Sequence, residues 1–322
     1  MAAATHSDTA GDQNSRTTWR SSTQANGSPG GEDPVPPYGT VVINEILTHQ
    51  DQDDPGDWIE LYNAGTGAVD ISYWYLSDNP AVLTNYQIAA GTLLPAGGYM
   101  VFDEYHNFGT NAIGARGFGL SELGETVYLS SGNSSNQLTS YRTYRDFEAA
   151  EQGVTFGRYI RSDGDMDFVA MDHPTLAATN AYPKIGPAVI NEIMYNPSAG
   201  GKEFIEILNV SGTPLPLFDV TRPTNTWQFH GATEYVFPTN TWMAPDELIV
   251  IASVVPAEFR QATGLTNPTL RILGPFTGSL NNAGDSIRLY KPNSPEPDGF
   301  VPQVRVERVK YSDESPWPVL AD

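Results

Sequence analysis

Short runs in which apolar and polar residues alternate recur along the chain and predict β-strands. The run from Trp58 to Tyr62 is one example, and turn sequences such as Asn63-Ala64-Gly65 and Pro95-Ala96-Gly97-Gly98 separate such runs. One helix is predicted, from Pro256 to Thr263, with Ser253 upstream and Gly264 as its stop. The predicted strands are 41–47, 57–63, 69–76, 86–88, 99–102, 125–130, 138–144, 154–160, 166–170, 188–194, 203–209, 215–218, 226–229, 235–237, 247–252, 285–290 and 304–311.

The order of these strands repeats. Val42-Ile43-Asn44-Glu45-Ile46 returns as Val189-Ile190-Asn191-Glu192-Ile193, and Asn44 and Asn191 are 147 positions apart. Further correspondences join 91–93 with 240–242, 99–102 with 248–251, and 124–129 with 284–289. A chain that repeats itself at domain length contains two copies of one module. We call residues 39–180 copy 1 and residues 187–322 copy 2.

Composition agrees with an all-β fold. The 322 residues are 39% hydrophobic and only 17% charged, with 30 Gly and 25 Pro, which is typical of short strands joined by tight turns. The pattern therefore predicts two antiparallel β-sandwiches. Residues 1–38 are rich in Ser, Thr, Gly, Asn and Pro, and are predicted to form a disordered arm because they offer little apolar surface to bury.

Charge and cysteine content exclude several classes of protein. The net charge of −21 repels phosphate backbones, so no nucleic-acid partner is expected, and no apolar run approaches the ~18 residues of a membrane span. The absence of Cys excludes disulfides and thiolate metal sites. Residues 1–14 lack the apolar segment of a signal peptide, which leaves a cytoplasmic protein or an internal piece of a longer secreted chain.

Several motifs occur in a fixed order in copy 1. They are I-N-E-I at 43–46, W-I-E-L-Y-N at 58–63, D-I-S-x-W-x-L-S-D at 70–78, G-T-x-L-P-A-G-G-Y-x-V-F at 91–102 and G-x-x-V-Y-L at 124–129. In this order they resemble the lamin tail domain family, whose members are immunoglobulin-like β-sandwiches. The resemblance thus implies two tandem immunoglobulin-like antiparallel β-sandwiches behind the arm. Copy 2 departs from the pattern at 211–229 but keeps Asn191, Glu192, Glu206, Asn209 and Gly284, and adds Tyr311 and Pro316-Trp317-Pro318.

The resemblance implies a fold more firmly than an activity. Bacterial members of the family occur as tandem modules in large exported proteins, so the expected location is extracellular or at the cell surface. The expected function is a non-catalytic spacer, adhesion or protein-interaction module with an unknown protein or glycan partner. The alternative is a carbohydrate- or calcium-binding accessory module attached to a catalytic domain outside this chain.

Copy 2 has no counterpart of residues 153–180, which supply the last predicted strands of copy 1. We therefore expect copy 2 to be C-terminally incomplete, with an unpaired sheet edge and an uncovered core. On this interpretation the chain is part of a longer protein, and copy 2 is its less stable half.

Both copies carry the same polar residues, Asn44, Glu45, Glu60 and Asn63 in copy 1 and Asn191, Glu192, Glu206 and Asn209 in copy 2. They form either a binding site or a structural signature of the fold. Strict alternation would place Glu45 on one face with Ile43 and Leu47, half-buried and hydrogen-bonded to loop amides. Asn63 and Asn209 end their strands, where turn conformations with positive φ suit Asn.

Two acidic loops are candidate Ca²⁺ sites, since Ca²⁺ takes six to eight oxygen ligands. The first comprises Asp51, Asp53, Asp54 and Asp57, and the second Asp163, Asp165 and Asp167. Copy 2 lacks the first loop, and the second lacks the Gly and Glu of an EF-hand at their positions. We expect both loops to be solvated turns of an acidic protein. The expected cofactor is therefore none, and Ca²⁺ is the open alternative.

Enzyme signatures are missing from the sequence. The five His residues are scattered, and neither H-E-x-x-H nor G-x-S-x-G occurs. We therefore expect no catalytic activity. Tyr73, Trp74 and Tyr75 must place rings on both sides of a strand, so they offer either an exposed surface for a glycan or a core Trp flanked by amphipathic Tyr residues.

Overall fold

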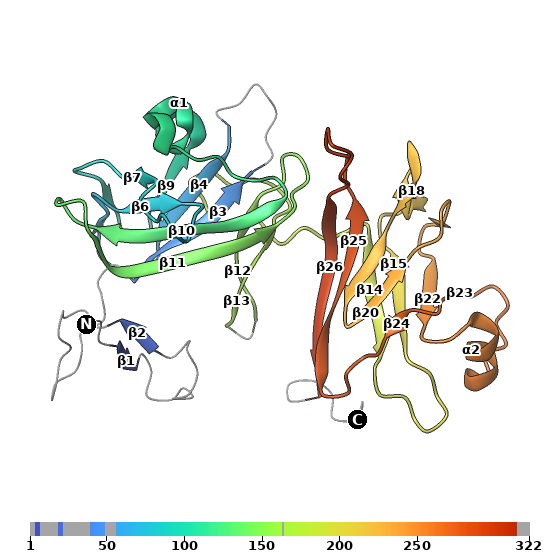
Figure 1. The fold of residues 1–322 in the computed structure, drawn as a ribbon. Coiled ribbons are helices and arrows are strands. Elements are labelled where there is room, and N and C mark those ends of the chain that lie inside the picture. The colour runs from blue at the N-terminus through green and yellow to red at the C-terminus, as the bar shows by residue number, and fades with distance from the viewer. Residues whose placement is uncertain (1–3, 7–18, 22–38, 49–55, 163, 314–322) are drawn as a thin grey trace. The chain divides into compact units, whose positions relative to one another are not determined.

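The computed structural model describes residues 4–6, 19–21, 39–48, 56–162 and 164–313 (Figure 1). The chain divides into two compact units, Met1–Lys184 and Ile185–Asp322. We call them unit 1 and unit 2. They contain copy 1 and copy 2, and each is considered by itself.

The N-terminal arm contains one short pair of strands. β1 (Ala4–His6) and β2 (Trp19–Ser21) pair antiparallel, with Thr5 opposite Arg20. These six residues are the described part of the arm expected over 1–38. The rest of the expected arm lies outside the described residues.

Unit 1 is a sandwich of two antiparallel sheets, and the long β10–β11 hairpin crosses in front of the β3–β4–β9 sheet (Figure 1). The first sheet has the order β13 (Met166–Ala170), β12 (Phe156–Ile160), β3 (Val41–Leu47), β4 (Trp58–Asn63) and β9 (Tyr99–Asp103). The second has the order β11 (Leu138–Glu148), β10 (Gly124–Gly132), β6 (Tyr75–Ser77) and β7 (Tyr86–Gln87). A separate pair joins β5 (Val69–Asp70) and β8 (Leu93–Leu94).

The core of unit 1 lies between these sheets. Ile59 and Leu61 of β4 face Val127 and Leu129 of β10 in one cluster of buried side chains, as alternation along each strand requires. Trp74 completes the same cluster. A short helical segment that the sequence pattern did not predict follows β9, consisting of η2 (Glu104–Phe108), α1 (Thr110–Ile113) and η3 (Gly114–Arg116).

Unit 2 repeats this arrangement with a different edge. One sheet has the order β14 (Ala188–Met194), β15 (Phe204–Asn209), β22 (Leu248–Ala252) and β23 (Arg271–Leu273). The other has the order β24 (Thr277–Gly278), β20 (Thr233–Val236), β19 (Gln228–Gly231), β25 (Gly284–Pro292) and β26 (Gln303–Ser312). Two small pairs join β16 (Leu215–Pro216) to β21 (Trp242–Met243) and β17 (Phe218–Asp219) to β18 (Arg222–Thr226).

The predicted helix is present as α2 (Pro256–Thr263), and it ends at Gly264, which has a left-handed φ of 68°. Its N-cap is Val255 rather than Ser253, and no side chain caps it. Phe259 of α2 packs on Phe204 with ring centroids 5.6 Å apart. The helix connects β22 to β23, which pair in parallel because a crossover helix returns the chain in the same direction. This parallel pair departs from the purely antiparallel arrangement expected.

The two units share a sheet order. β14, β15 and β22 follow each other as β3, β4 and β9 do, and β25 and β26 pair as β10 and β11 do. The difference lies beyond β3, where β12 and β13 extend the sheet of unit 1. In unit 2 no described strand pairs with the outer edge of β14. Across the described ranges, neither α-helix has the length and apolar character needed to cross a lipid bilayer.

Candidate functional site: two Asn–Glu clusters

The repeated Ile-Asn-Glu-Ile sequence forms a β-bulge in each unit. On β3, Ile43 pairs with Leu61 and Glu45 with Glu60, so Asn44 is the extra residue. Unit 2 has the same shift at Asn191.

The bulge changes which face Glu45 occupies. Ile43 and Ile46 both enter the core, although strict alternation would put them on opposite faces. Glu45 therefore points away from Ile43, and the expectation that the two share a face is wrong. Hydrogen-bonding by a loop amide is confirmed, and burial is deeper than expected, since Glu45 is fully buried.

Asn44 links three segments of unit 1. Its Nδ2 donates to Glu60 Oε1 at 2.8 Å and to Asn180 Oδ1 at 2.6 Å. The side chain of Asn180 in turn donates to the carbonyl oxygen of Asn44 at 3.1 Å and to that of Arg158 at 2.9 Å. Asn180 thus holds the end of the 153–180 segment against both β3 and β12.

The Glu45 carboxylate receives its donors from the same segment. The Thr155 hydroxyl donates to Glu45 Oε1 at 2.6 Å, and the Thr175 hydroxyl donates to Oε2 at 2.8 Å. The Thr175 amide lies 3.2 Å from each carboxylate oxygen. Bonds from neutral donors to a buried carboxylate are stronger than those between neutral groups.

Glu60 lies opposite Glu45 and is also fully buried. Its Oε2 accepts the Ala177 amide at 2.6 Å. Burial raises the pKa of Glu60 and the neighbouring Glu45 carboxylate raises it further, whereas the bonds from Ala177 and Asn44 lower it. Two carboxylates side by side are tolerated here because five donor groups surround them.

The cluster of unit 1 therefore fixes the 153–180 segment to β3. Every donor outside β3 and β4 comes from this segment, through Thr155, Thr175, Ala177 and Asn180. Sequence reasoning selected the acceptors and missed these donors, because Thr, Ala and Asn are common in loops and carry no distinctive spacing. We call the side chains of Asn44, Glu45 and Glu60 the closed cluster.

In unit 2 the same acceptors face solvent. Asn191 Nδ2 donates to Glu206 Oε1 at 2.8 Å, the same distance as in unit 1. Asn191 and Glu192 are exposed, and Glu206 is partly exposed. Within the described ranges, no donor bonds to the carboxylate of Glu192 or to Oε2 of Glu206. We call Asn191, Glu192 and Glu206 the open cluster.

Asn63 and Asn209 are fully buried and join turns to strands. Asn63 Nδ2 donates to the carbonyl oxygens of Gly67 at 2.8 Å and of Leu94 at 3.1 Å, and Asn63 Oδ1 accepts the Gly65 amide at 3.0 Å. Neither Asn has the positive φ that the sequence suggested. Their side-chain amides, rather than their backbone conformations, explain why Asn is required.

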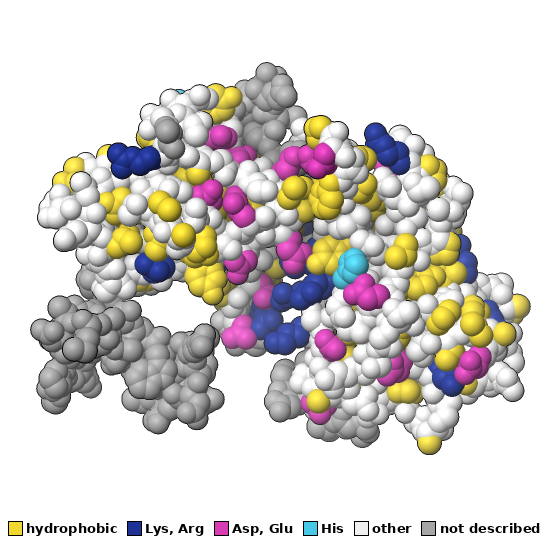
Figure 2. Space-filling view, viewed as in Figure 1, with side chains coloured by type: hydrophobic (Ala, Val, Ile, Leu, Met, Phe, Trp, Pro, Cys, Tyr) yellow, Lys and Arg dark blue, Asp and Glu magenta, His cyan; other side chains and the backbone are white. Residues whose placement is uncertain are grey.

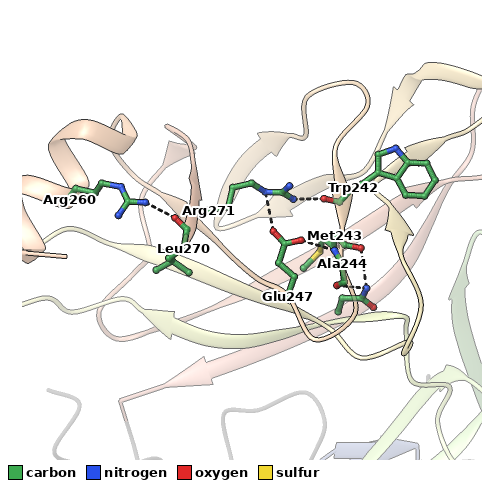
Figure 3. A network of polar contacts seen from close by, with 8 residues as sticks. Trp242, Met243, Ala244, Glu247, Arg260, Leu270 and Arg271 are labelled. Carbon is green, nitrogen blue, oxygen red and sulfur yellow. Dashed lines mark hydrogen bonds and ion pairs between the residues drawn. The ribbon is translucent and has the colours of Figure 1, made fainter. Parts of the chain in front are cut away.

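Asn209 makes the matching bonds in unit 2, to the carbonyl oxygens of Met243 at 3.3 Å and Ala244 at 2.9 Å. Figure 3 shows the surrounding network, in which Glu247 lies between Arg271 and the backbone of Ala244. Glu247 Oε2 accepts the Ala244 amide at 2.6 Å, and Glu247 Oε1 lies 3.5 Å from Arg271 Nε. Arg271 also donates to the carbonyl oxygen of Trp242 at 2.5 Å, so the turn is tied to β23.

Asp57 is the described member of the first acidic loop, and Asp51, Asp53 and Asp54 lie outside the described residues. Asp57 Oδ2 accepts the Leu120 amide at 3.1 Å. Burial, followed by the neighbouring Glu104 carboxylate, raises the pKa of Asp57 to about 7, against which the Leu120 bond acts. Glu122 and Glu125 add to the increase.

The second acidic loop is the turn of the β12–β13 hairpin, and its Asp163 lies outside the described residues. Asp165 and Asp167 both face Arg161, with Asp165 Oδ2 at 2.7 Å from Arg161 Nη2 and Asp167 Oδ2 at 3.6 Å from Nη1. A guanidinium in this position competes with a cation for the same oxygens. Among the residues that the structure describes, no three Asp, Glu or His side chains are grouped to hold a metal ion.

The aromatic triplet does not form an exposed surface. Trp74 is in the core, 5.5 Å from the ring of Tyr141, whose hydroxyl donates to the carbonyl oxygen of Val41 at 2.6 Å. Tyr75 is buried, and its hydroxyl accepts from Gln87 at 2.7 Å. Only Tyr73 is partly exposed. The interpretation with Trp74 in the core is the correct one, although Tyr75 lies deeper than it required.

The exposed apolar residues include one matched position that the sequence did not suggest. Leu93 is 56% exposed on β8, and Trp242 is 45% exposed at the equivalent place on β21. The residue after each is fully buried.

Figure 2 shows that the acidic side chains of the visible face form several small, separate groups rather than one patch.

Comparison with protein families agrees with this duplicated arrangement. The profile described as Lamin Tail Domain matches residues 34–145 and 183–308, which together make up most of the chain. Comparison with the curated proteins and with the solved structures gives no match. The matched regions include both Asn–Glu clusters, whereas residues 153–180 lie outside them. The chain therefore belongs to the lamin tail domain family, and it carries two of these immunoglobulin-like modules in tandem.

Proposed function

We propose that the chain is a non-catalytic pair of modules that acts as a spacer and as an adhesion or protein-interaction element of a larger exported bacterial protein. Its location would be extracellular or at the cell surface, as the family resemblance suggests. An immunoglobulin-like domain family is consistent with a non-catalytic module.

One observation carries this proposal: the closed cluster of unit 1, together with Asn63 and Asn209, serves the fold. In unit 1 the Glu45 and Glu60 carboxylates are buried and occupied by donors from the 153–180 segment. The side-chain amides of Asn63 and Asn209 donate hydrogen bonds to turn carbonyl oxygens. A general acid or base must reach a substrate, and these buried groups do not.

Exposed apolar side chains support a role in protein contact. Leu93 and Trp242 lie at equivalent positions of the two units, and both are exposed beside a fully buried neighbour. Large apolar residues, and Trp above all, contribute a large share of the binding free energy in protein interfaces.

The alternative, a carbohydrate- or calcium-binding accessory module, has weaker support. Burial of Trp74 and Tyr75 leaves Tyr73 as the one ring of the triplet that could stack on a sugar. Arg161 pairs with Asp165 and Asp167 and competes with Ca²⁺ for these two carboxylates.

The test compares the purified full chain in hydrolase assays and on a glycan array, with and without Ca²⁺. The proposal expects no hydrolysis of glycoside, ester, phosphate or peptide substrates and no saturable glycan binding. Saturable glycan binding that Tyr73→Ala abolishes, with Tyr105→Ala as the control at another exposed Tyr, would favour the accessory module. Hydrolysis by the purified chain would overturn the proposal.

A further inference from the structure

We propose that the outer edge of β14, with the open cluster, is a docking site for an extended segment of a partner protein. This inference rests on the proposed protein-interaction function and specifies the kind of partner. The segment is a neutral strand and turn, rich in hydroxyl and amide donors. It binds as residues 153–180 bind to β3 in unit 1.

The two edges have the same construction. Asn44 and Asn191 occupy the same bulge, and the Asn-to-Glu hydrogen bond measures 2.8 Å in both units. On β3 this edge is occupied, since Phe156 and Gly157 of β12 pair with Ile46 and Glu45. The equivalent residues of β14 are Ile193 and Glu192, and no described strand pairs with them there.

Partly exposed apolar side chains lie beside the main-chain groups of β14 that pair with no described strand. Ile43 and Ile46 are fully buried in unit 1. Their counterparts Ile190 and Ile193 are only partly buried, although both contact the core of unit 2. A docked strand would complete their burial, as β12 does in unit 1, and it would satisfy the unpaired edge.

Unit 2 closes its core without such a segment. In unit 1, Phe156 of β12 packs on Phe147 with centroids 5.8 Å apart. In unit 2, Tyr195 stacks on Tyr311 at 4.8 Å, and Tyr311 occupies the position of Phe147 at the end of the strand pair. The uncovered core expected from the sequence is therefore not found, because Tyr195 covers it. Among the described strands, none covers the outer edge of β14.

The open cluster defines the chemistry of the partner. Glu45 and Glu60 receive hydrogen bonds from hydroxyl groups and main-chain amides of the 153–180 segment, none of which is charged, and no residue that the structure describes supplies such donors to Glu192 or Glu206. In unit 1 Gly157 lies opposite Glu45, and a Cβ there would come within 2.8 Å of Asn180 and Met171 of the same segment, so a partner segment that folds back as residues 153–180 do needs a small residue opposite Glu192. A second β14 is a poor occupant, since antiparallel pairing would bring its own carboxylates against these.

The experiment uses the full chain and a synthetic peptide with the sequence of residues 153–180. A control peptide carries Thr155→Val and Thr175→Val, which keep the shape and remove both hydroxyl donors. Hydrogen exchange followed by mass spectrometry reports on 188–194 and 41–47 separately. With peptide at ten times its Kd, exchange of 188–194 should slow about tenfold, because binding suppresses opening by that factor.

Matched variants distinguish binding by the carboxylates of the open cluster from a general effect of negative charge. Glu192→Gln combined with Glu206→Gln should abolish the slowing. Asp246→Asn should leave it unchanged, because it removes a negative charge from an exposed turn of the same unit and Asn tolerates the φ of 58° found there.

Several results would overturn the inference. They are unchanged exchange of 188–194, slowing confined to 41–47, equal slowing by the control peptide, or slowing that depends on protein concentration alone and accompanies a dimer in light scattering. None of these results involves catalysis or glycan binding, so the proposed function would survive them. Hydrolytic activity would refute the proposed function without affecting the exchange data.

Discussion

Asn44 and Asn191 show how one short sequence produces two environments. Both residues sit in a bulge and both hold the carboxylate of the neighbouring strand at 2.8 Å. The side chain of Asn44 is buried and that of Asn191 is exposed, because residues 153–180 pack along the outer edge of β3, whereas no described segment pairs with that edge of β14. Local sequence fixes the bulge, and neighbouring segments fix the exposure.

Asp57 should make the stability of unit 1 depend on pH. The folded protein binds this proton more tightly than the unfolded chain does, since the pKa rises from 3.8 to about 7. The free energy of unfolding therefore falls as pH rises from about 4 through 7. Asp57→Asn removes the buried charge and keeps an acceptor for Leu120, so it should stabilise unit 1 at pH 8 by on the order of 2–4 kcal/mol.

Thermal melts of the full chain between pH 4 and pH 8 provide the measurement. The advantage of Asp57→Asn should shrink as the pH falls towards 4, where Asp57 of the folded protein is protonated and carries no buried charge. Asp298→Asn, at an exposed turn of unit 2, serves as the control and should change little. A benefit that is constant across this range would contradict burial as the cause.

Asn63 and Asn209 should each be costly to replace. Asn63→Ala or Asn209→Ala leaves turn carbonyls and a turn amide without partners in a buried place, which costs on the order of 2–4 kcal/mol. Asn79→Ala should cost less, since this exposed Asn side chain accepts only the Ala81 amide. Urea unfolding of the three variants gives the comparison, and equal costs would mean that the buried bonds contribute nothing special.

Sequence could select the acceptors of the clusters but not their surroundings. Repetition of Asn and Glu in both copies marked Asn44, Glu45 and Glu60. It could not show the bulge, because a single extra residue leaves no mark on an apolar pattern this short. Thr155 and Thr175 stayed hidden because their partner Glu45 lies 110 and 130 positions away.

At the scale of elements, β12 depends on the closed cluster for its attachment. It pairs with β3 through two residues only, so hydrogen bonds to Glu45 contribute much of the contact. Thr155→Val removes the hydroxyl donor to this buried carboxylate with little change of shape, and should destabilise unit 1 by about 1.5–3 kcal/mol.

The matched control is Thr126→Val. Thr126 also donates to a carboxylate, that of Asp146 at 2.5 Å, but this bond is exposed to water. It should cost less than about 0.5 kcal/mol. The loss of stability in each variant is measured by chemical denaturation, with hydrogen exchange of residues 156–160 as the signal. A Thr155→Val cost no larger than that of Thr126→Val would show that the cluster does not hold β12.

Elements with strong local signals were predicted well. Pro256 and Gly264 mark α2, and its observed bounds are those expected. β23 was missed because Arg271–Leu273 is too short for a periodic signal, and its parallel pairing follows from the α2 crossover. The helical segment 104–116 was missed because Gly109 and Gly114 lie within it and Gly117 and Gly119 follow it, and this spacing of Gly argues for a loop.

At the scale of the whole molecule, the two units should differ in stability. β3 is paired on both sides, whereas β14 is paired with β15 alone among the described strands. Calorimetry of the full chain should therefore show two transitions, with unit 2 unfolding first. Thr155→Val should lower the upper transition alone. A single transition, or a shift of the lower one by this variant, would contradict the assignment.

Tandem organisation was predictable from sequence because repetition needs no knowledge of the fold. The repeat of Val42–Ile46 predicted two copies of one module, and the alternation of apolar and polar residues predicted that each copy is a β-sandwich. The closure of the core by Tyr195 was not predictable. It depends on a ring contact with Tyr311, 116 positions later, that no pattern within the β14 region encodes.

Hydrogen exchange of β3 and β14 in the same molecule tests the central claim most directly. The claim is that equivalent strands carry equivalent Asn–Glu clusters, one closed by residues 153–180 and the other open. The account predicts that amides of 41–47 exchange much more slowly than those of 188–194, with the difference concentrated in the amides that face β12 in unit 1 and the unpaired edge in unit 2. Equal protection of the two strands would contradict it.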